Sequence, residues 1–176
     1  DGNHIEVAHA DTFEFADERF TVSLLERYLT SPVDTDRWII KGTHGSPGTG
    51  SRYEVFLDND GDVRLAIDNG TANVKSRIQV DNAPFLTGDW VHVVAIRDAA
   101  GNQLSIYADG IKLDATGDAG VDTSGDISNG ENLWIGESTD ETGTAMMGDI
   151  DDVHIYAKVL TVDEIPEIYS YFQPEE

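Results

Sequence analysis

The chain has 176 residues, of which 39% are hydrophobic, and its 34 acidic and 11 basic side chains give a formal net charge of −23 at pH 7. So negative a chain repels phosphate backbones and anionic lipid headgroups, which excludes nucleic-acid binding and disfavours attachment to a membrane surface. The absence of cysteine excludes disulfides and thiol chemistry, and no apolar run approaches the roughly 20 residues that membrane insertion of a helix requires.

Strand patterns dominate the chain from its first residues onward. Residues 20–24 and 63–67 alternate with period two, the spacing of a half-buried strand. Asn, Asp and Gly residues separate such runs, and two hairpins are predicted, one joining 54–57 to 63–67 and one joining 90–97 to 104–108. About ten short strands of this kind predict a two-sheet antiparallel β-sandwich. The predicted strands are 4–7, 20–24, 38–41, 52–57, 63–67, 75–80, 90–97, 104–108, 133–135 and 150–156.

Two segments between the strands are predicted loops, and one segment after the last strand is a predicted helix. Residues 43–51 and 115–131 are rich in Gly, Ser, Thr and Asp, and loops of a sandwich commonly carry recognition sites. Thr161 followed by Glu164 is a capping-box pattern, which predicts the start of one short helix, and Pro166 should end or bend that helix soon afterwards. Residues 1–176 are expected to form a single domain of a longer protein.

Short motifs spread over nearly the whole chain resemble one family. They are Asp1-Gly2, His4–Val7, Phe20–Ser23, Ile39–Gly42, Tyr53–Val55, Trp90–Val94, Leu104–Gly110, Leu133–Gly136, Gly148–Tyr156 and Leu160–Ile165. In this order they are similar to the laminin G-like branch of the concanavalin A-like lectin/glucanase superfamily, whose domains occur as modules of large secreted bacterial proteins. The resemblance implies an all-β jelly roll, a secreted or cell-surface location and a monomeric module. The fold hosts lectins, adhesion modules and enzymes, so the ligand has to be inferred from the residues.

The resemblance also implies one structural calcium ion near the joined ends of the first and last strands. The matching carboxylates are Asp1, Asp11 and Asp151, and backbone carbonyl groups would complete the oxygen shell that calcium requires. Asp151 also shares a strand face with Val153 and Ile155, so its carboxylate should point inward at the rim of the core, where it needs a cation or several N–H donors. The alternative is that Asp151 accepts backbone hydrogen bonds and that the other two carboxylates are solvated.

A second acidic run, Asp58-Asn59-Asp60-Gly61-Asp62, is similar to the start of an EF-hand loop. Its glycine falls one place before Asp62, and the twelfth position of the run is Asn69 rather than a glutamate. A hairpin turn explains these residues fully, and we predict a turn here rather than a metal site.

The sequence contains no pattern typical of an enzyme. Glucanases of the superfamily use a Glu-x-Asp-x-Glu strand, in which alternation places the carboxylates on one face at the separation of a retaining pair, and this chain has no such strand. The five histidines show no His-Glu-x-x-His spacing, and the chain has neither a nucleophile elbow nor a phosphate-binding loop. We therefore expect a non-catalytic protein.

Arginines and aromatic side chains are the candidate ligand-binding residues. In so acidic a chain, arginines gathered on one sheet could form a receptor for carboxylate or sulfate groups, and aromatic rings could stack on sugar faces. The alternative is that the arginines only offset nearby carboxylates and that the tryptophans belong to the core. The candidates are Arg27, Arg52, Arg64, Arg77, Trp38, Trp134 and Tyr53.

Together these features predict a non-catalytic module that binds a polysaccharide or glycan and holds a structural calcium ion. The alternative is a protein-binding or cell-adhesion module without a sugar site. The acidic surface suits high-salt or marine media, where a hydrated coat of carboxylates maintains solubility. We prefer this explanation of the charge to one in which the carboxylates serve calcium and adhesion.

Overall fold

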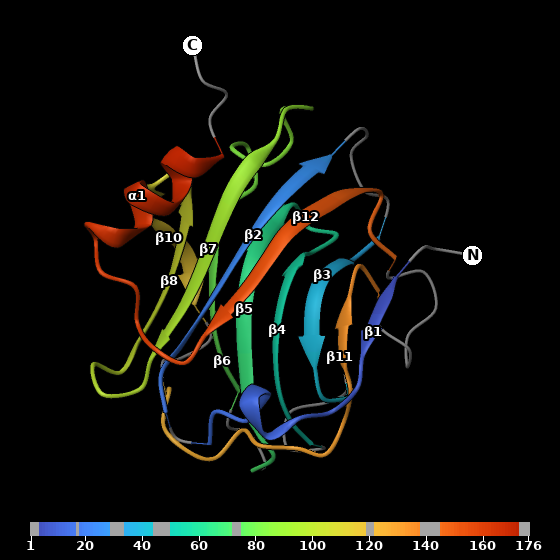
Figure 1. The fold of residues 1–176 in the computed structure, drawn as a ribbon, viewed down its shortest axis with the longest axis vertical. Coiled ribbons are helices and arrows are strands. Elements are labelled where there is room, and N and C mark those ends of the chain that lie inside the picture. The colour runs from blue at the N-terminus through green and yellow to red at the C-terminus, as the bar shows by residue number, and fades with distance from the viewer. Residues whose placement is uncertain are drawn as a thin grey trace.

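A computed structural model describes residues 4–16, 18–28, 34–43, 50–71, 75–118, 122–137 and 145–172. In these residues two antiparallel sheets pack face to face, so the predicted β-sandwich is confirmed (Figure 1). Sheet A has the order β1-β11-β3-β4-β5-β6-β10 and sheet B the order β12-β2-β7-β8-β9.

The elements of each sheet come from distant parts of the chain. Sheet A comprises β1 (Ile5–Val7), β3 (Asp36–Lys41), β4 (Ser51–Leu57), β5 (Asp62–Asn69), β6 (Lys75–Asp81), β10 (Ala115–Asp118) and β11 (Leu133–Ile135). Sheet B comprises β2 (Phe20–Tyr28), β7 (Val91–Asp98), β8 (Gln103–Ala108), β9 (Ile111–Lys112) and β12 (Gly148–Tyr156). The short 3-10 helix η1 (Asp11–Phe13) lies between β1 and β2, and helix α1 (Glu164–Tyr171) follows β12.

Both predicted hairpins are confirmed. β4 pairs with β5, and Leu57 opposite Val63 is the register pair next to the turn. β7 pairs with β8. In the β4–β5 turn the N–H of Asp58 donates to the carbonyl of Asp62, and Gly61 has a φ of +92°, a conformation that favours glycine. The acidic run from Asp58 to Asp62 is therefore a hairpin turn, as predicted.

Part of one predicted loop is a strand. Within the segment 115–131, β10 adds to the edge of sheet A beside β6, with a bulge between Ala115 and Gly117. The sequence of β10, Ala-Thr-Gly-Asp, is low in β-propensity and does not alternate, because an exposed edge strand needs no apolar face. The other predicted loop, 43–51, falls mostly on residues 44–49, which lie outside the described residues.

The core fills the space between the two sheets. It contains buried, alternating side chains of both sheets, among them Leu24 of β2, Leu65 of β5 and Val93 of β7. Glu26 lies on the same side of β2 as Leu24, has no exposed surface, and neither of its carboxylate oxygens has a hydrogen-bond partner among the described residues. Burial, with the negative charge of Asp109 as the second cause, raises the pKa of Glu26 to about 9. Glu26 is therefore a neutral acid at pH 7.

Helix α1 covers part of the outer face of sheet B (Figure 1). Its Ile165 packs with Val94 of β7 and Tyr107 of β8 in a small second apolar cluster. The predicted capping box is confirmed, because Glu164 Oε2 accepts from the N–H of Thr161 at 2.8 Å and Thr161 Oγ1 accepts from the N–H of Glu164 at 3.2 Å.

The predicted short helix is confirmed, but it does not end soon after Pro166. The helix continues to Tyr171, because Pro166 falls in the first turn of α1, where a missing N–H is tolerated. No helix in the described residues is long and apolar enough to cross a membrane.

A β-bulge in β12 reverses the predicted direction of Asp151. The register of β12 on β2 shifts between Asp151 and His154, and Asp152 has a φ of +46°. Asp151 is consequently the partner of Leu25 on the outer face of sheet B, and its side chain is exposed. The expected inward carboxylate at the rim of the core is not formed, because simple alternation does not hold across the bulge.

Candidate functional site

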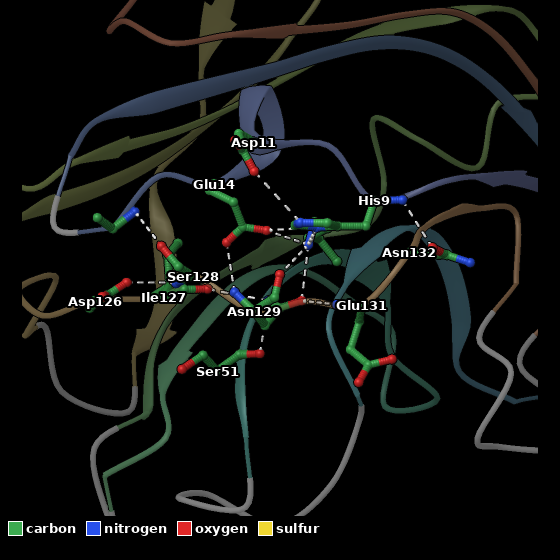
Figure 2. A network of polar contacts seen from close by, with 12 residues as sticks. His9, Asp11, Glu14, Ser51, Asp126, Ile127, Ser128, Asn129, Glu131 and Asn132 are labelled. Atoms are coloured by element: carbon green, nitrogen blue, oxygen red, sulfur yellow. Dashed lines mark hydrogen bonds and ion pairs between the residues drawn. The ribbon is translucent and has the colours of Figure 1, made fainter.

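One end of the sandwich carries a polar network around Glu14 and Asn129 (Figure 2). Lys41 is the central cation of this network. The Lys41 side chain has no exposed surface, and its Nζ donates to Glu14 Oε1 at 2.7 Å and to the backbone and side-chain oxygens of Asn129 at 2.8 and 3.0 Å. Glu14 also accepts from the N–H of Asn129 at 2.6 Å, and Nδ1 of His9 lies 3.2 Å from Glu14. The network thus fixes the β1–β2 and β10–β11 connections to the end of β3.

The surroundings of Asp11 do not fit the predicted calcium site. Calcium needs six to eight oxygen ligands, whereas the nearest oxygens of this network already surround the Lys41 ammonium. Asp11 lies at the margin of the network with a fully exposed carboxylate, 3.8 Å from Nε2 of His9 (Figure 2).

Asp11 and Asp151 also lie far apart. Asp151 is level with Leu25, roughly 17 Å along β2 from Phe20, whereas η1 lies at the end of the sandwich where β2 begins (Figure 1). Asp1 is outside the described residues, and within them no three His, Asp or Glu side chains are grouped so that they could hold a metal ion. Calcium binding stays a prediction, which thermal unfolding with and without EDTA would test.

Trp38 and Tyr53 belong to the core, so the prediction that they stack on a sugar is wrong. Their exposed fractions are 0% and 1%. Trp38 Nε1 donates to the hydroxyl of Tyr28 at 2.9 Å, and the Tyr53 ring lies 4.8 Å from that of Phe20. Tyr53 follows the core side of the alternation of β4, whereas Trp38 lies in the bulge between Arg37 and Ile39, which places it in the core beside Ile39.

Four of the seven arginines lie on the outer face of sheet A, and we call them the arginine face. They are Arg37, Arg52, Arg64 and Arg77. Arg52, Arg64 and Arg77 were predicted candidates, and the pairing of β4, β5 and β6 brings them onto one surface. Arg37 was missed, because a bulge between Arg37 and Ile39 disturbs the alternation of β3.

Glu54 lies at the centre of the arginine face. Its two carboxylate oxygens accept from Nε of Arg37 at 3.1 Å and from Nε of Arg52 at 3.2 Å. All three side chains are almost completely buried, and Arg52 Nη1 lies a further 3.8 Å from Asp68. Such a buried, mutually bonded set is rigid, and its burial prevents direct contact with a ligand.

Arg64 and Arg77 form the other half of the arginine face. Arg64 is ion-paired to Asp58 and Asp60 of the hairpin turn. Arg77 is half-buried and makes no hydrogen bond or ion pair with any described residue, and the buried Nε atoms of both arginines have no acceptor there. The pKa of Arg64 is lowered, first by burial and second by the positive charge of Arg77, so the two guanidinium groups lie close enough to repel each other. Arg64 is only 5% exposed, so Arg77 is the guanidinium of this pair that an anionic ligand could reach.

The remaining two candidates lie elsewhere. Trp134 is half-buried on the outer face of sheet A, opposite Ile40, and its ring packs against His4 at 5.0 Å. Four strand spacings, roughly 19 Å, separate it from Arg77, and the side chains between them are buried. Arg27 lies on the other sheet, where it pairs with Asp149 of β12.

A family model described as the concanavalin A-like lectin/glucanases superfamily matches residues 1–166. The chain belongs to this superfamily. No curated protein matches the chain. The expected family and the jelly-roll fold are therefore confirmed, and the fold places the arginine face of this superfamily member on the larger of its two sheets.

Several solved structures share the fold of this superfamily member at low sequence identity. The CBM40 module of the Ruminococcus gnavus IT-sialidase, bound to α2,3-sialyllactose, has a TM-score of 0.66 at 14% identity, with 95% of this chain and 96% of that chain covered. The binding domain of paraclostridial mosquitocidal protein 1 has a TM-score of 0.69 at 16% identity, covering 96% and 41%. The binding domain of botulinum neurotoxin DC in complex with rat synaptotagmin II has a TM-score of 0.66 at 15% identity, covering 97% and 40%. The chain thus spans about two fifths of these toxin domains.

Proposed function

We propose that the chain is a non-catalytic module that binds glycans carrying carboxylate or sulfate groups through Arg77, beside which the buried Arg64 adds positive charge. The observation that carries the proposal is the unpaired guanidinium of Arg77 beside Arg64, in a chain with a net charge of −23. Carboxylates are abundant on this protein, yet Arg77 makes no ion pair with a described one, and its charge acts on Asp62 without a direct contact. A guanidinium donates two parallel hydrogen bonds to a carboxylate or sulfate, which gives both affinity and orientation.

The comparisons support this proposal at the level of the fold. The sialidase module, which matches over nearly its whole length, binds sialyllactose, an oligosaccharide with one carboxylate. The ligands that we propose for this chain are negatively charged, as sialyllactose is. The field of the −23 chain opposes an anionic ligand at long range, but salt at sea-water strength screens that field within several ångströms.

Protein binding is the second candidate function, and one surface favours it. A cavity of about 500 Å³ lies at the open side of the sandwich between β1 and β12, and its lining includes Ile5, Ile135 and Met146. Ile5 is 60% exposed, so the edge of this cavity presents an apolar side chain that a protein partner could cover. The botulinum neurotoxin DC binding domain, which shares this fold over 40% of its length, is in complex with a protein, rat synaptotagmin II.

The first test is a glycan array that contains neutral, sialylated, uronic-acid and sulfated oligosaccharides. We expect binding to acidic members, and we expect Arg77→Gln to weaken the affinity for the best of them at least tenfold in isothermal titration. Loss of one charge-assisted bond to a ligand costs about 1.5–3 kcal/mol, and about 1.4 kcal/mol corresponds to a factor of ten.

Arg19→Gln is the matched control, because Arg19 is an exposed arginine before β2 and lies outside the arginine face. It makes the same change in net charge and should leave the affinity unchanged. Equal affinities of Arg77→Gln and the unaltered protein, or an array without any acidic ligand, would contradict the proposal and favour protein binding.

A further inference from the structure

A row of three side chains crosses the outer face of sheet B, on the opposite side of the molecule from the arginine face. Asp149 of β12 is the register partner of Arg27 of β2. Glu26 of β2 is the register partner of Val91, the first residue of β7. In the antiparallel register the next pair is therefore Arg27 with Trp90, which directly precedes β7. The guanidinium carbon of Arg27 lies 4.9 Å from the centroid of the Trp90 ring. A carboxylate, a guanidinium and an indole therefore follow one another across three neighbouring strands.

This row is accessible. Trp90 is 40% exposed, and the side chains of Arg27 and Asp149 are 36% and 45% exposed. Helix α1 covers the outer face over Val94 and Tyr107, and Tyr169 near its end contacts His92, close to the row, whose three side chains stay partly exposed. Trp90 is also the most exposed of the three tryptophans, since Trp38 is buried and Trp134 is half-buried.

The ion pair leaves one donor group and one acceptor atom unused. Nε and Nη2 of Arg27 both donate to the same oxygen, Oδ2 of Asp149, at 3.2 and 2.6 Å. Nη1 of Arg27 and Oδ1 of Asp149 make no hydrogen bond with any described residue. The pair thus holds N–H donors and a carboxylate acceptor side by side next to an exposed indole. Two neighbouring hydroxyl groups of a ligand could satisfy both, because a hydroxyl accepts and donates.

The local charge favours a neutral ligand. Arg27 and Asp149 neutralise each other, and the nearby exposed side chains are the acidic Asp89, beside Trp90 in the sequence, and Asp151, in the next row on this face. An anionic ligand would be repelled by these carboxylates, and a cationic ligand would compete with Arg27 for Asp149.

We propose that Trp90, Arg27 and Asp149 form a second saccharide-binding site, which takes a neutral pyranose. One apolar face of the sugar packs against the exposed part of the indole, and two adjacent hydroxyls bind Nη1 of Arg27 and Oδ1 of Asp149. The site is independent of the arginine face, so either could exist without the other.

The test is a titration of the intact module with cellohexaose, maltohexaose and laminarihexaose, followed by the indole N–H signals of the three tryptophans in NMR. We expect at least one of these neutral oligosaccharides to shift the Trp90 signal, which Trp90→Phe assigns by its absence. Trp90→Ala should then weaken binding about tenfold or more in isothermal titration. Asp149→Asn should weaken it as well, because it replaces the charged acceptor and loosens the ion pair.

Trp134→Ala is the matched control on the other sheet and should leave neutral-sugar binding unchanged. Circular dichroism of each variant checks that the fold is intact. The proposal is overturned if none of the three oligosaccharides shifts the Trp90 signal at millimolar concentration, or if Trp134→Ala weakens binding as much as Trp90→Ala. Arg77→Gln should leave this binding unaltered and Trp90→Ala should leave acidic-glycan binding unaltered, so failure of one site is distinguishable from failure of the other.

Discussion

Replacement of Lys41 by methionine should lower the free energy of unfolding by about 4 kcal/mol, because removal of one partner leaves a buried polar set without its cation. Glu14, whose side chain is only 17% exposed, would keep its charge without the ammonium 2.7 Å away. Two oxygens of Asn129 would lose their donor. Thermal unfolding followed by circular dichroism should show a midpoint about 10 °C lower.

Lys112→Met is the matched control, since Lys112 is an exposed lysine of β9. It should change the free energy of unfolding by no more than about 0.5 kcal/mol. The double variant Lys41→Met/Glu14→Gln should recover part of the loss, because it also removes the uncompensated carboxylate. If Lys41→Met were as stable as the control, the network in Figure 2 would not hold the loops at this end of the sandwich.

Replacement of Glu26 by glutamine should stabilise the protein at alkaline pH. Between about pH 4.5, the ordinary pKa of the group, and its folded-state pKa of about 9, the folded state binds a proton that the unfolded state has released. The free energy of unfolding therefore falls as the pH rises through this window, by about 1.4 kcal/mol per unit. From pH 6.5 to 8.5 the unaltered protein should lose about 3 kcal/mol through this group. The Glu26→Gln variant should show no such loss.

Urea unfolding at a series of pH values between 6.5 and 8.5 measures this difference. The choice of window avoids His92, because burial and then the charge of His154 lower the pKa of His92 to about 4, which confines its effect to lower pH. Glu18→Gln, a change at an exposed glutamate, should keep the slope of the unaltered protein. Parallel slopes for Glu26→Gln and the unaltered protein would mean that Glu26 is ionised and solvated in the folded state.

The fold could be predicted from the sequence because most strands carry an alternating or continuous apolar pattern. The pairing of Leu57 with Val63 follows directly from the turn residues between them. β10 lacks this pattern, because its residues touch little of the core. The helix beyond Pro166 was also missed, because a proline is tolerated in the first turn of a helix but not further along it. Both predictions failed because the tertiary structure stabilises a strand or a helix that the local sequence does not favour.

The candidate site was predictable only in part, for a related reason. Alternation places Arg52 and Arg64 away from the core, but it does not say which strands become neighbours, so Arg27 was grouped with arginines of the other sheet. Bulges hid the outward direction of Arg37 and of Asp151, because an inserted residue reverses the two faces of a strand. Trp90 carried no signal of exposure, since it directly precedes a strand whose residues are nearly all buried.

The bulge in β12 also bears on how the protein behaves when it is concentrated. β12 has nine residues and is paired only with β2, so its free edge could template a strand of a second molecule and begin a growing fibre. At Asp152 the regular spacing of N–H and C=O groups is interrupted, and the exposed carboxylates of Asp151 and Asp152 stand at the interruption. A strand that approached this edge would lose its register and meet two negative charges. The irregularity that turns Asp151 outward therefore also protects the longest free edge of the described sheets from aggregation.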